Sequence, residues 1–260
     1  MSAEPHAILM LAQRDLTKLL RDRARLVSEL VFPIVFIGIL GASLNSAFGS
    51  AIGYDFVTFT FTGVFAMTLF QTTAQGIISL IEDRETDFAQ EIFVSPISRY
   101  TIVAGKIVGE TLVASPVAVG IVAFAFILGV PLTLERIAAL AVGGLIAAFF
   151  GGSFGVLVLS NLPNRRAAQN VFPFLMLPQY FLSGIFNPMV HQPAYLDVAS
   201  RLSPMRYAVD LVRGLFYRGA SEYPQVVLQD PPLVIAVIAA AFVGFMVVGT
   251  ALFVRREQDR

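Results

Sequence analysis

One short motif in the chain matches a pattern that activates a serine for nucleophilic attack. Residues 151–155 read Gly-Gly-Ser-Phe-Gly, which fits the G-x-S-x-G nucleophile elbow. A serine becomes a nucleophile only beside a base, and both histidines, His6 and His191, lie outside the long apolar blocks. We therefore interpret Gly151 and Gly155 as small residues that let two helices pack closely, as in G-x-x-x-G pairs.

Other common chemistries lack the residues that they need. The chain has no cysteine and its two histidines are far apart in the sequence, so neither a thiol nucleophile nor a buried metal site is expected. There is no G-x-x-x-x-G-K-[ST] phosphate loop, because Gly105 and Lys106 are followed by Ile107 and lack the earlier glycine. The formal net charge is zero, whereas proteins that bind nucleic acid carry a basic surplus. The sequence thus predicts no directly bound cofactor and no nucleic-acid partner.

Polar, uncharged side chains recur within two apolar blocks, 56–81 and 167–186. The first block carries several threonines and glutamines. The second carries Pro173 and Pro178, which bend membrane helices and free backbone carbonyls. Such groups either bond packed helices to each other or line a weakly polar path, and the sequence leaves both uses open. The residues of this possible substrate path are Thr68, Gln71, Thr72, Gln75, Asn170, Gln179 and Ser183.

The connection that follows the first of these blocks is short and acidic. Five acids against Arg84 give its first ten residues a net charge of −4. Phe88 and Ile92 share one face of a predicted helix that Pro96 ends, with Phe93 beside them. A charge run is often only a solvated loop, but exposed aromatics within it favour docking to a partner. The predicted docking residues of segment 82–106 are Glu82, Arg84, Glu85, Phe88, Glu91, Ile92, Phe93 and Pro96.

The segment 187–232 contains another amphipathic helix. Ser203 is a predicted N-cap with Pro204 at the first helical position. Asp210 is spaced to pair with Arg206 and with Arg213. We expect this helix to lie against the outer leaflet or to dip into it, as a gate or as a structural lid. The predicted outer-gate residues are Phe186, Pro188, Pro204, Tyr207, Asp210 and Arg213.

All of these segments must be positioned by membrane-spanning helices. The chain is 56% hydrophobic and only 14% charged, against about 25% charged in soluble domains. Six apolar blocks reach the length of about 20 residues that crosses a bilayer, and none contains Asp, Glu, Lys, Arg or His. We predict an all-α, polytopic membrane protein with one domain over 1–260, an amphipathic interfacial helix within 1–29 and short extracellular or re-entrant helices between spans five and six. The predicted spans are Leu30–Phe48, Phe56–Ile81, Thr111–Val130, Ile137–Leu159, Ala167–Phe186 and Leu233–Val254.

The distribution of basic residues predicts the orientation of these spans. Of the 18 Lys and Arg residues, 13 lie on one side of the predicted membrane and five on the other. Because the side richer in Lys and Arg is cytoplasmic, both termini should lie inside. An even number of spans satisfies this arrangement.

With these segments in view, the chain resembles the permease subunits of ABC type 2 (ABC-2) exporters of drugs, lipids or polysaccharides, over essentially its whole length. Residues 90–106 are similar to the family's cytoplasmic connection, in which a leucine-rich helix is followed by S-P-x-S-R and G-K. Residues 181–213 are similar to the family's signature after the fifth span. Asp87 and Phe88 depart from the pattern, since many members have Gly-Thr there.

The resemblance implies a transport subunit and not an enzyme. It implies pairing with a second copy or a similar permease, and cytoplasmic ATPase subunits that bind ATP and magnesium and act through the acidic coupling segment. We expect a cell (inner or plasma) membrane of a bacterium, and a drug, lipid or glycan-type amphipathic substrate. One rival is a secondary transporter, which usually carries ionisable groups at mid-membrane. The other is an intramembrane enzyme, for which the predicted last span lacks a histidine.

Overall fold

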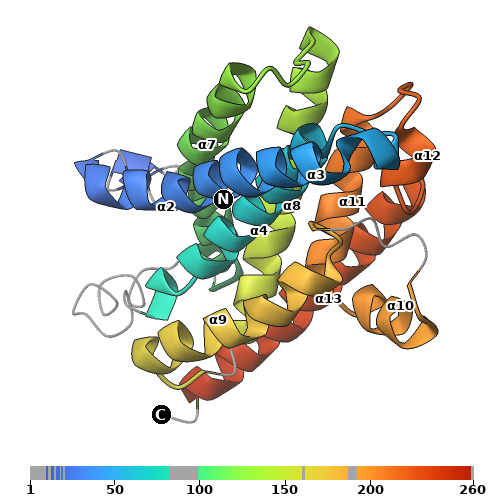
Figure 1. Ribbon diagram of the computed structural model, residues 1–260. Coiled ribbons are helices and arrows are strands. Elements are labelled where there is room, and N and C mark those ends of the chain that lie inside the picture. The colour runs from blue at the N-terminus through green and yellow to red at the C-terminus, as the bar shows by residue number, and fades with distance from the viewer. Residues whose placement is uncertain are drawn as a thin grey trace.

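The computed structural model describes residues 10, 13–14, 16–17, 19, 21–81, 99–159, 162–186 and 192–258. Every regular element in these ranges is a helix, which confirms the predicted all-α fold (Figure 1). In chain order the elements are α2 (Arg23–Val35), a π-helical segment (Phe36–Gly41), α3 (Ala42–Ile52), α4 (Phe56–Gly76), α7 (Arg99–Ile127), α8 (Leu134–Leu159), α9 (Arg165–Leu182), α10 (Ala194–Arg201), α11 (Pro204–Phe216), α12 (Tyr223–Val226) and α13 (Pro231–Gln258).

Five stretches of helix in the described ranges are long and apolar enough to cross a membrane. Each overlaps one of the predicted spans, so the chain is a multi-pass membrane protein. They are Leu26–Ala47, Phe56–Ile81, Tyr100–Ile127, Leu134–Val158 and Tyr223–Phe253.

The remaining predicted span, Ala167–Phe186, overlaps α9, which is not one of these five. This helix has 18 residues and contains Pro173 and Pro178. Arg165 and Arg166 form its first turn, and its polar side chains lower its mean hydropathy. The count of six spans therefore stays a prediction.

The described spans differ from the predicted ones in their boundaries and in the charges that they contain. The first span begins at Leu26, inside the segment assigned to an interfacial helix within 1–29, because α2 runs unbroken into it. Most residues before Arg21 lie outside the described ranges, and the rest of that prediction with them. The described spans also contain charges, including Lys106 and Glu110 in α7. These two pair one helical turn apart, which offsets part of the cost of burying them.

Helix α4 forms the centre of the molecule, packed against α7, α8 and α11. Its contact with α8 is close, because a Cβ atom on Gly151 would lie 2.1 Å from the carbonyl oxygen of Phe70. A Cβ atom on Gly155 would lie 2.5 Å from the carbonyl oxygen of Ala74. The interpretation of the glycine motif as helix packing is therefore confirmed. The buried Ser153 hydroxyl donates to the carbonyl of Phe150 at 2.7 Å, within its own helix.

The helix predicted to lie against the outer leaflet or to dip into it is packed inside the bundle. Helix α11 packs against α4, α8 and α13, and its apolar residues such as Val209, Val212 and Phe216 are buried. Its apolar face is thus covered by protein. Helix α10 is the exposed one: it stands away from the bundle in Figure 1, and Tyr195 and Leu202 at its two ends are 72% and 81% exposed.

The predicted orientation is testable because the chain has no cysteine of its own. A single cysteine in place of Glu222, between α11 and α12, should react with a membrane-impermeant maleimide added outside intact cells. A cysteine in place of Arg255, at the end of α13, should react only after the cells are opened. Modification of the cysteine at position 222 from the cytoplasmic side alone would reverse the predicted orientation.

Candidate functional site

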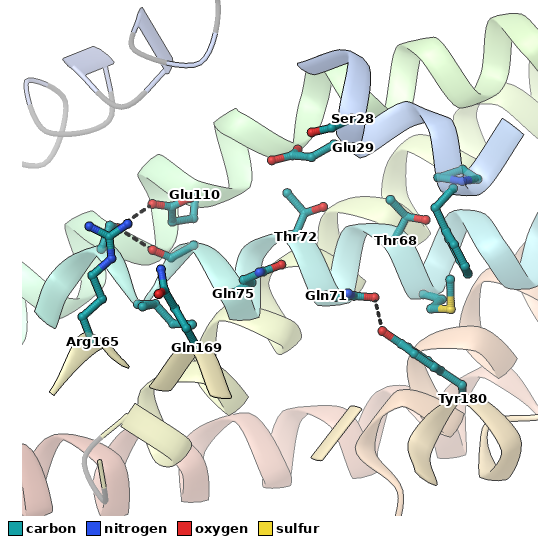
Figure 2. Close-up of a pocket in the computed structure, with 16 residues that line it drawn as sticks. Ser28, Glu29, Thr68, Gln71, Thr72, Gln75, Glu110, Arg165, Gln169 and Tyr180 are labelled. Carbon is teal, nitrogen blue, oxygen red and sulfur yellow. Dashed lines mark hydrogen bonds between the residues drawn. The ribbon is translucent and has the colours of Figure 1, made fainter. Parts of the chain in front are cut away.

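A cleft of about 610 Å³ lies between α2, α4, α7 and α9 (Figure 2). It runs along the second half of α4, from Met67 to Ser79 just past its end, and along α9 from Arg165 to Tyr180. Its walls combine hydroxyls, amides, two carboxylates and one guanidinium. The lining residues are Ser28, Glu29, Phe32, Pro33, Met67, Thr68, Gln71, Thr72, Gln75, Gly76, Ile78, Ser79, Glu110, Arg165, Gln169 and Tyr180.

Helix α4 provides one continuous polar wall of this cleft. Thr68, Gln71, Thr72 and Gln75 are three or four residues apart, which places them on the same side of a helix. Across the cleft, the Tyr180 hydroxyl of α9 donates to Oε1 of Gln71 at 2.6 Å (Figure 2). This bond joins α4 to α9 at one end of the polar wall.

A smaller, mostly apolar groove of about 270 Å³ adjoins the cleft. Gln71, Gln75 and Tyr180 line both spaces, so the polar and apolar regions share a boundary. The other groove residues belong to α9, and its Phe174 is 77% exposed. Together the two spaces offer hydrogen-bonding groups on one side and an apolar surface on the other.

Charged residues gather at the end of the cleft where α7 and α9 begin. Glu110 is 4% exposed and lies 3.2 Å from the Lys106 ammonium. The Ser79 hydroxyl donates to the same Oε1 atom at 3.2 Å. Figure 2 shows Arg165 of α9 pointing toward Glu110, while Glu29 lies above them on α2.

The predicted substrate path is only partly assembled. Its four α4 residues, Thr68, Gln71, Thr72 and Gln75, line the cleft. Its three α9 residues do not: Asn170 is exposed elsewhere, Gln179 accepts from the Met205 amide at 3.3 Å, and Ser183 donates to the Tyr180 carbonyl. Gln179 and Ser183 thus stabilise the α9–α11 contact and the end of α9.

The prediction from sequence missed the charged members of the cleft, Glu29, Glu110 and Arg165, because they fell outside the predicted spans. A signal existed for Glu110: Lys106 precedes it by one turn in an otherwise apolar stretch. Gln169 and Tyr180 of α9 were also missed. Two prolines disturb the regular spacing of this helix, so the spacing of its residues does not predict which side chains share a face.

Arg213, a predicted outer-gate residue, is 2% exposed and ties three segments together. Its Nη1 donates to the Gly184 carbonyl at 2.7 Å, and its Nη2 donates to the carbonyls of Phe59 and Ile185 at 3.3 Å. The guanidinium also lies 3.7 Å from the centre of the Phe59 ring. Gly63 leaves space for it, because a Cβ atom there would lie 2.7 Å from Nη2.

The predicted pairing of Asp210 with Arg206 and Arg213 was wrong. Asp210 instead accepts from the backbone amides of Leu228 and Gln229, at 2.9 and 3.0 Å. Arg206 lies 3.4 Å from Asp197 of α10 and also donates to the Ser200 hydroxyl. Asp210 and Arg206 thus bind groups from other segments of the chain and not each other.

Asp197 pairs with one arginine of its own helix and with one arginine of α11. It lies 2.8 Å from Arg201 as well as close to Arg206, and hydrogen bonding from Arg201 lowers the pKa of its carboxyl. Its folded-state pKa is thus below the unfolded value, so this contribution to stability is present at neutral pH. It is lost as the pH falls through that lowered pKa.

The other described outer-gate residues do not line the cleft. Tyr207 donates to the Arg201 carbonyl at 2.9 Å, and Pro204 occupies the first turn of α11. The Phe186 ring packs on Phe36 and Phe181, with centroids 5.1 and 5.5 Å apart. Pro188 lies outside the described residues.

All eight predicted docking residues, from Glu82 to Pro96, also lie outside the described residues. The structure defines only the two ends of that segment, at Ile81 and Arg99. Within the described ranges, no three His, Cys, Asp or Glu side chains are grouped so that they could hold a metal ion.

Comparison with known proteins gives the family. The family model described as "ABC-2 type transporter" matches residues 6–217. The chain is 25% identical over 213 residues to "Putative transport permease ycf38" of Cyanophora paradoxa, covering 80% of this chain and 73% of the relative. It is 28% identical over 151 residues to "Probable multidrug ABC transporter permease YbhR" of Escherichia coli, covering 55% of this chain and 39% of that protein.

A third relative, "Nodulation protein J" of Rhizobium leguminosarum bv. trifolii, is 26% identical over 192 residues, covering 73% of both chains. The family model spans all of the residues that line the cleft, as well as Arg206 and Arg213 of α11. The all-helical, multi-pass architecture fits a transport permease, and the family is not one of enzymes. The chain therefore belongs to the ABC-2 type transporter family.

Proposed function

We propose that the chain is the membrane subunit of an ATP-driven exporter whose substrate is amphipathic. The observation that carries this proposal is the polar cleft of about 610 Å³ adjoining an apolar groove of about 270 Å³. A polar head group fits the hydroxyls and amides of α4, and an apolar part fits the surface of α9. Drugs, lipids and lipid-linked glycans all combine these two parts.

The polar wall of α4 gives a direct test. Replacing Gln71 and Gln75 together with leucine removes two amides from the boundary between cleft and groove. Each lost hydrogen bond is worth about 0.5–1.5 kcal/mol, so half-maximal stimulation of ATP hydrolysis should need roughly tenfold more substrate. The measurement is ATP hydrolysis by the complex reconstituted with its ATPase subunit, in the presence of a bisbenzimide dye, a phospholipid or a lipid-linked glycan.

Asn170→Leu is the matched control, since Asn170 is an exposed amide on α9 that does not line the cleft. It should leave the substrate concentration for stimulation unchanged. Failure of all three compounds to stimulate hydrolysis, or equal behaviour of the double variant and the control, contradicts the proposed use of the cleft.

We also propose that segment 82–96 docks into a separate ATPase subunit, with Phe88, Ile92 and Phe93 as anchors. Aromatic side chains at the centre of an interface carry a large share of its binding energy. Truncating Phe88 or Phe93 to alanine should weaken association by about 1–3 kcal/mol. The acids around them should mainly set the rate of association and its salt sensitivity. Copurification of the ATPase subunit at increasing salt measures both effects, and wild-type binding and transport by the double alanine variant would contradict the docking role.

The working unit we propose contains a second copy of this chain or a similar permease, with ATP and magnesium bound by the ATPase subunits. Exposed apolar residues on α2, the π-helical segment and α9, such as Val31, Ile39 and Phe181, support this pairing, because they remain uncovered within one chain. The proposed location is the cell membrane of a bacterium, with both termini in the cytoplasm.

A further inference from the structure

Glu110 is a carboxylate on α7 that touches both the cleft and the end of α4. It is 4% exposed, and its Oε1 atom lies 3.2 Å from both the Lys106 ammonium and the Ser79 hydroxyl. Lys106 belongs to the same helix as Glu110, whereas Ser79 lies just past the end of α4. The Ser79 bond is thus a polar link between two helices.

The backbone of α4 is shaped to receive this carboxylate. A Cβ atom on Gly76, the last residue of α4, would lie 2.0 Å from Oε2 of Glu110. A side chain at position 76 would therefore displace Glu110 or separate the helices. The Gly76 carbonyl also accepts from Ser79, so the single hydroxyl proton is shared between Glu110 and the end of α4.

The two linked helices are the ones that carry the proposed docking segment. The chain leaves α4 through Ser79 and Ile81, and it returns at Arg99 to begin α7. Ser79 lies three residues before Glu82 in the sequence, where the acidic segment starts. The segment is thus joined at one end to the residues just past α4 and at the other end to α7, the two helices that the Glu110–Ser79 bond connects.

The same link forms part of the cleft. Gly76, Ser79 and Glu110 all line it, and Arg165 points toward Glu110 from the opposite wall, α9 (Figure 2). We propose that Glu110 is a positioning residue: it accepts a hydrogen bond from the Ser79 hydroxyl and so transmits displacement of the docking segment to the walls of the cleft. This inference rests on the proposed ATPase-driven function.

Two charge-neutral variants separate this role from a general contribution to folding. Both carry Lys106→Met, so that no buried charge is left unpaired. The first adds Glu110→Leu, which removes the acceptor for Ser79. The second adds Glu110→Gln. The glutamine amide oxygen can still accept the hydrogen bond from Ser79, and glutamine matches glutamate in size. A merely structural role of the ion pair predicts that the two variants behave alike.

The measurement is the reaction rate of one cysteine in the cleft. Gln75→Cys is introduced into the cysteine-free chain, at an exposed position of α4 that lines the cleft. The purified complex with its ATPase subunit is treated with a water-soluble maleimide, either free of nucleotide or trapped with ATP, magnesium and vanadate. A cysteine in place of Val119, 69% exposed on α7 and outside the cleft, corrects for general changes in reactivity.

We expect the maleimide reaction rate at position 75 to differ between the nucleotide-free and the vanadate-trapped state. This difference should appear both in the otherwise unaltered chain and in the glutamine variant. In the leucine variant this difference should shrink roughly threefold, which is the value of an average hydrogen bond between membrane helices. Equal results for the two variants, whether both keep or both lose the difference, overturn the role of Glu110 alone. Absence of any difference between the two states in the unaltered complex, despite ATP hydrolysis, overturns the inference as well. Absence of ATP hydrolysis in that complex overturns the proposed function, and the inference with it.

Discussion

Gly151→Val is expected to prevent α4 and α8 from packing in their native contact. The added Cβ atom would lie 2.1 Å from the Phe70 carbonyl oxygen and 2.7 Å from its carbon, and both atoms belong to the backbone. Backbone within a helix cannot move aside as a side chain can, so the two helices must separate. Overpacking a core usually costs about 1–3 kcal/mol, and a clash with backbone at the central helix should reach the top of that range or exceed it.

Thermal unfolding and gel filtration of the detergent-purified protein measure this effect. Gly244→Val is the matched control, because it makes the same replacement in another membrane helix, α13, where no atom lies within 4 Å of the added Cβ. Intrinsic helix propensity changes equally in both variants. Equal unfolding temperatures for the two variants would show that the α4–α8 contact is not close in the folded protein.

Arg213→Met is expected to loosen the connection after α9. The guanidinium is the donor to the carbonyls of Gly184 and Ile185, and a buried carbonyl that loses its donor costs about 1–3 kcal/mol. Removing a buried cation also removes its desolvation cost, so we expect a net loss no higher than the middle of that range, about 2 kcal/mol or roughly 30-fold in local opening.

Local opening is measured by the reaction rate of Ile185→Cys with a maleimide, since Ile185 is fully buried in the folded chain. The rate should rise roughly 30-fold in the Arg213→Met background, following the opening equilibrium. Arg218→Met is the matched control, because Arg218 lies one turn beyond α11 and is exposed. An unchanged rate in the Arg213 variant would mean that the three carbonyl bonds do not hold this segment.

Hydropathy predicted most of the helices but placed the start of the third span too late. The third predicted span began at Thr111, whereas α7 begins at Arg99 and buries Lys106 and Glu110. A count of charges treats both residues as exposed to water. It cannot register that the two charges lie one turn apart and largely satisfy each other.

The cleft was predictable where one regular helix supplies its wall. Thr68, Gln71, Thr72 and Gln75 recur at helical spacing on α4, and all four line it. On α9 the same reasoning failed, because two prolines bend the helix and Gln179 turns to bind the Met205 amide.

The charges of α11 show a different limit of prediction from sequence. Residues one turn apart can always be drawn as a pair, as Asp210 and Arg213 were. In the folded chain both find partners distant in the sequence: backbone amides at 228 and 229 for the acid, and backbone carbonyls at 59, 184 and 185 for the arginine. Only the tertiary structure brings those groups within reach.

The glycine contact of α8 with α4 also divides the molecule by mechanical compliance. Where backbone meets backbone, as at Gly151 and Gly155, there are no flexible side chains to absorb a shift, so this pair of helices resists deformation as one stiff beam. Helices α2 and α9 contact α4 far less than α8 does, and they leave much of their own surface uncovered. The cleft therefore lies between the stiff α4–α8 pair and the more compliant helices α2 and α9. A given force should change the width of the molecule most at this cleft.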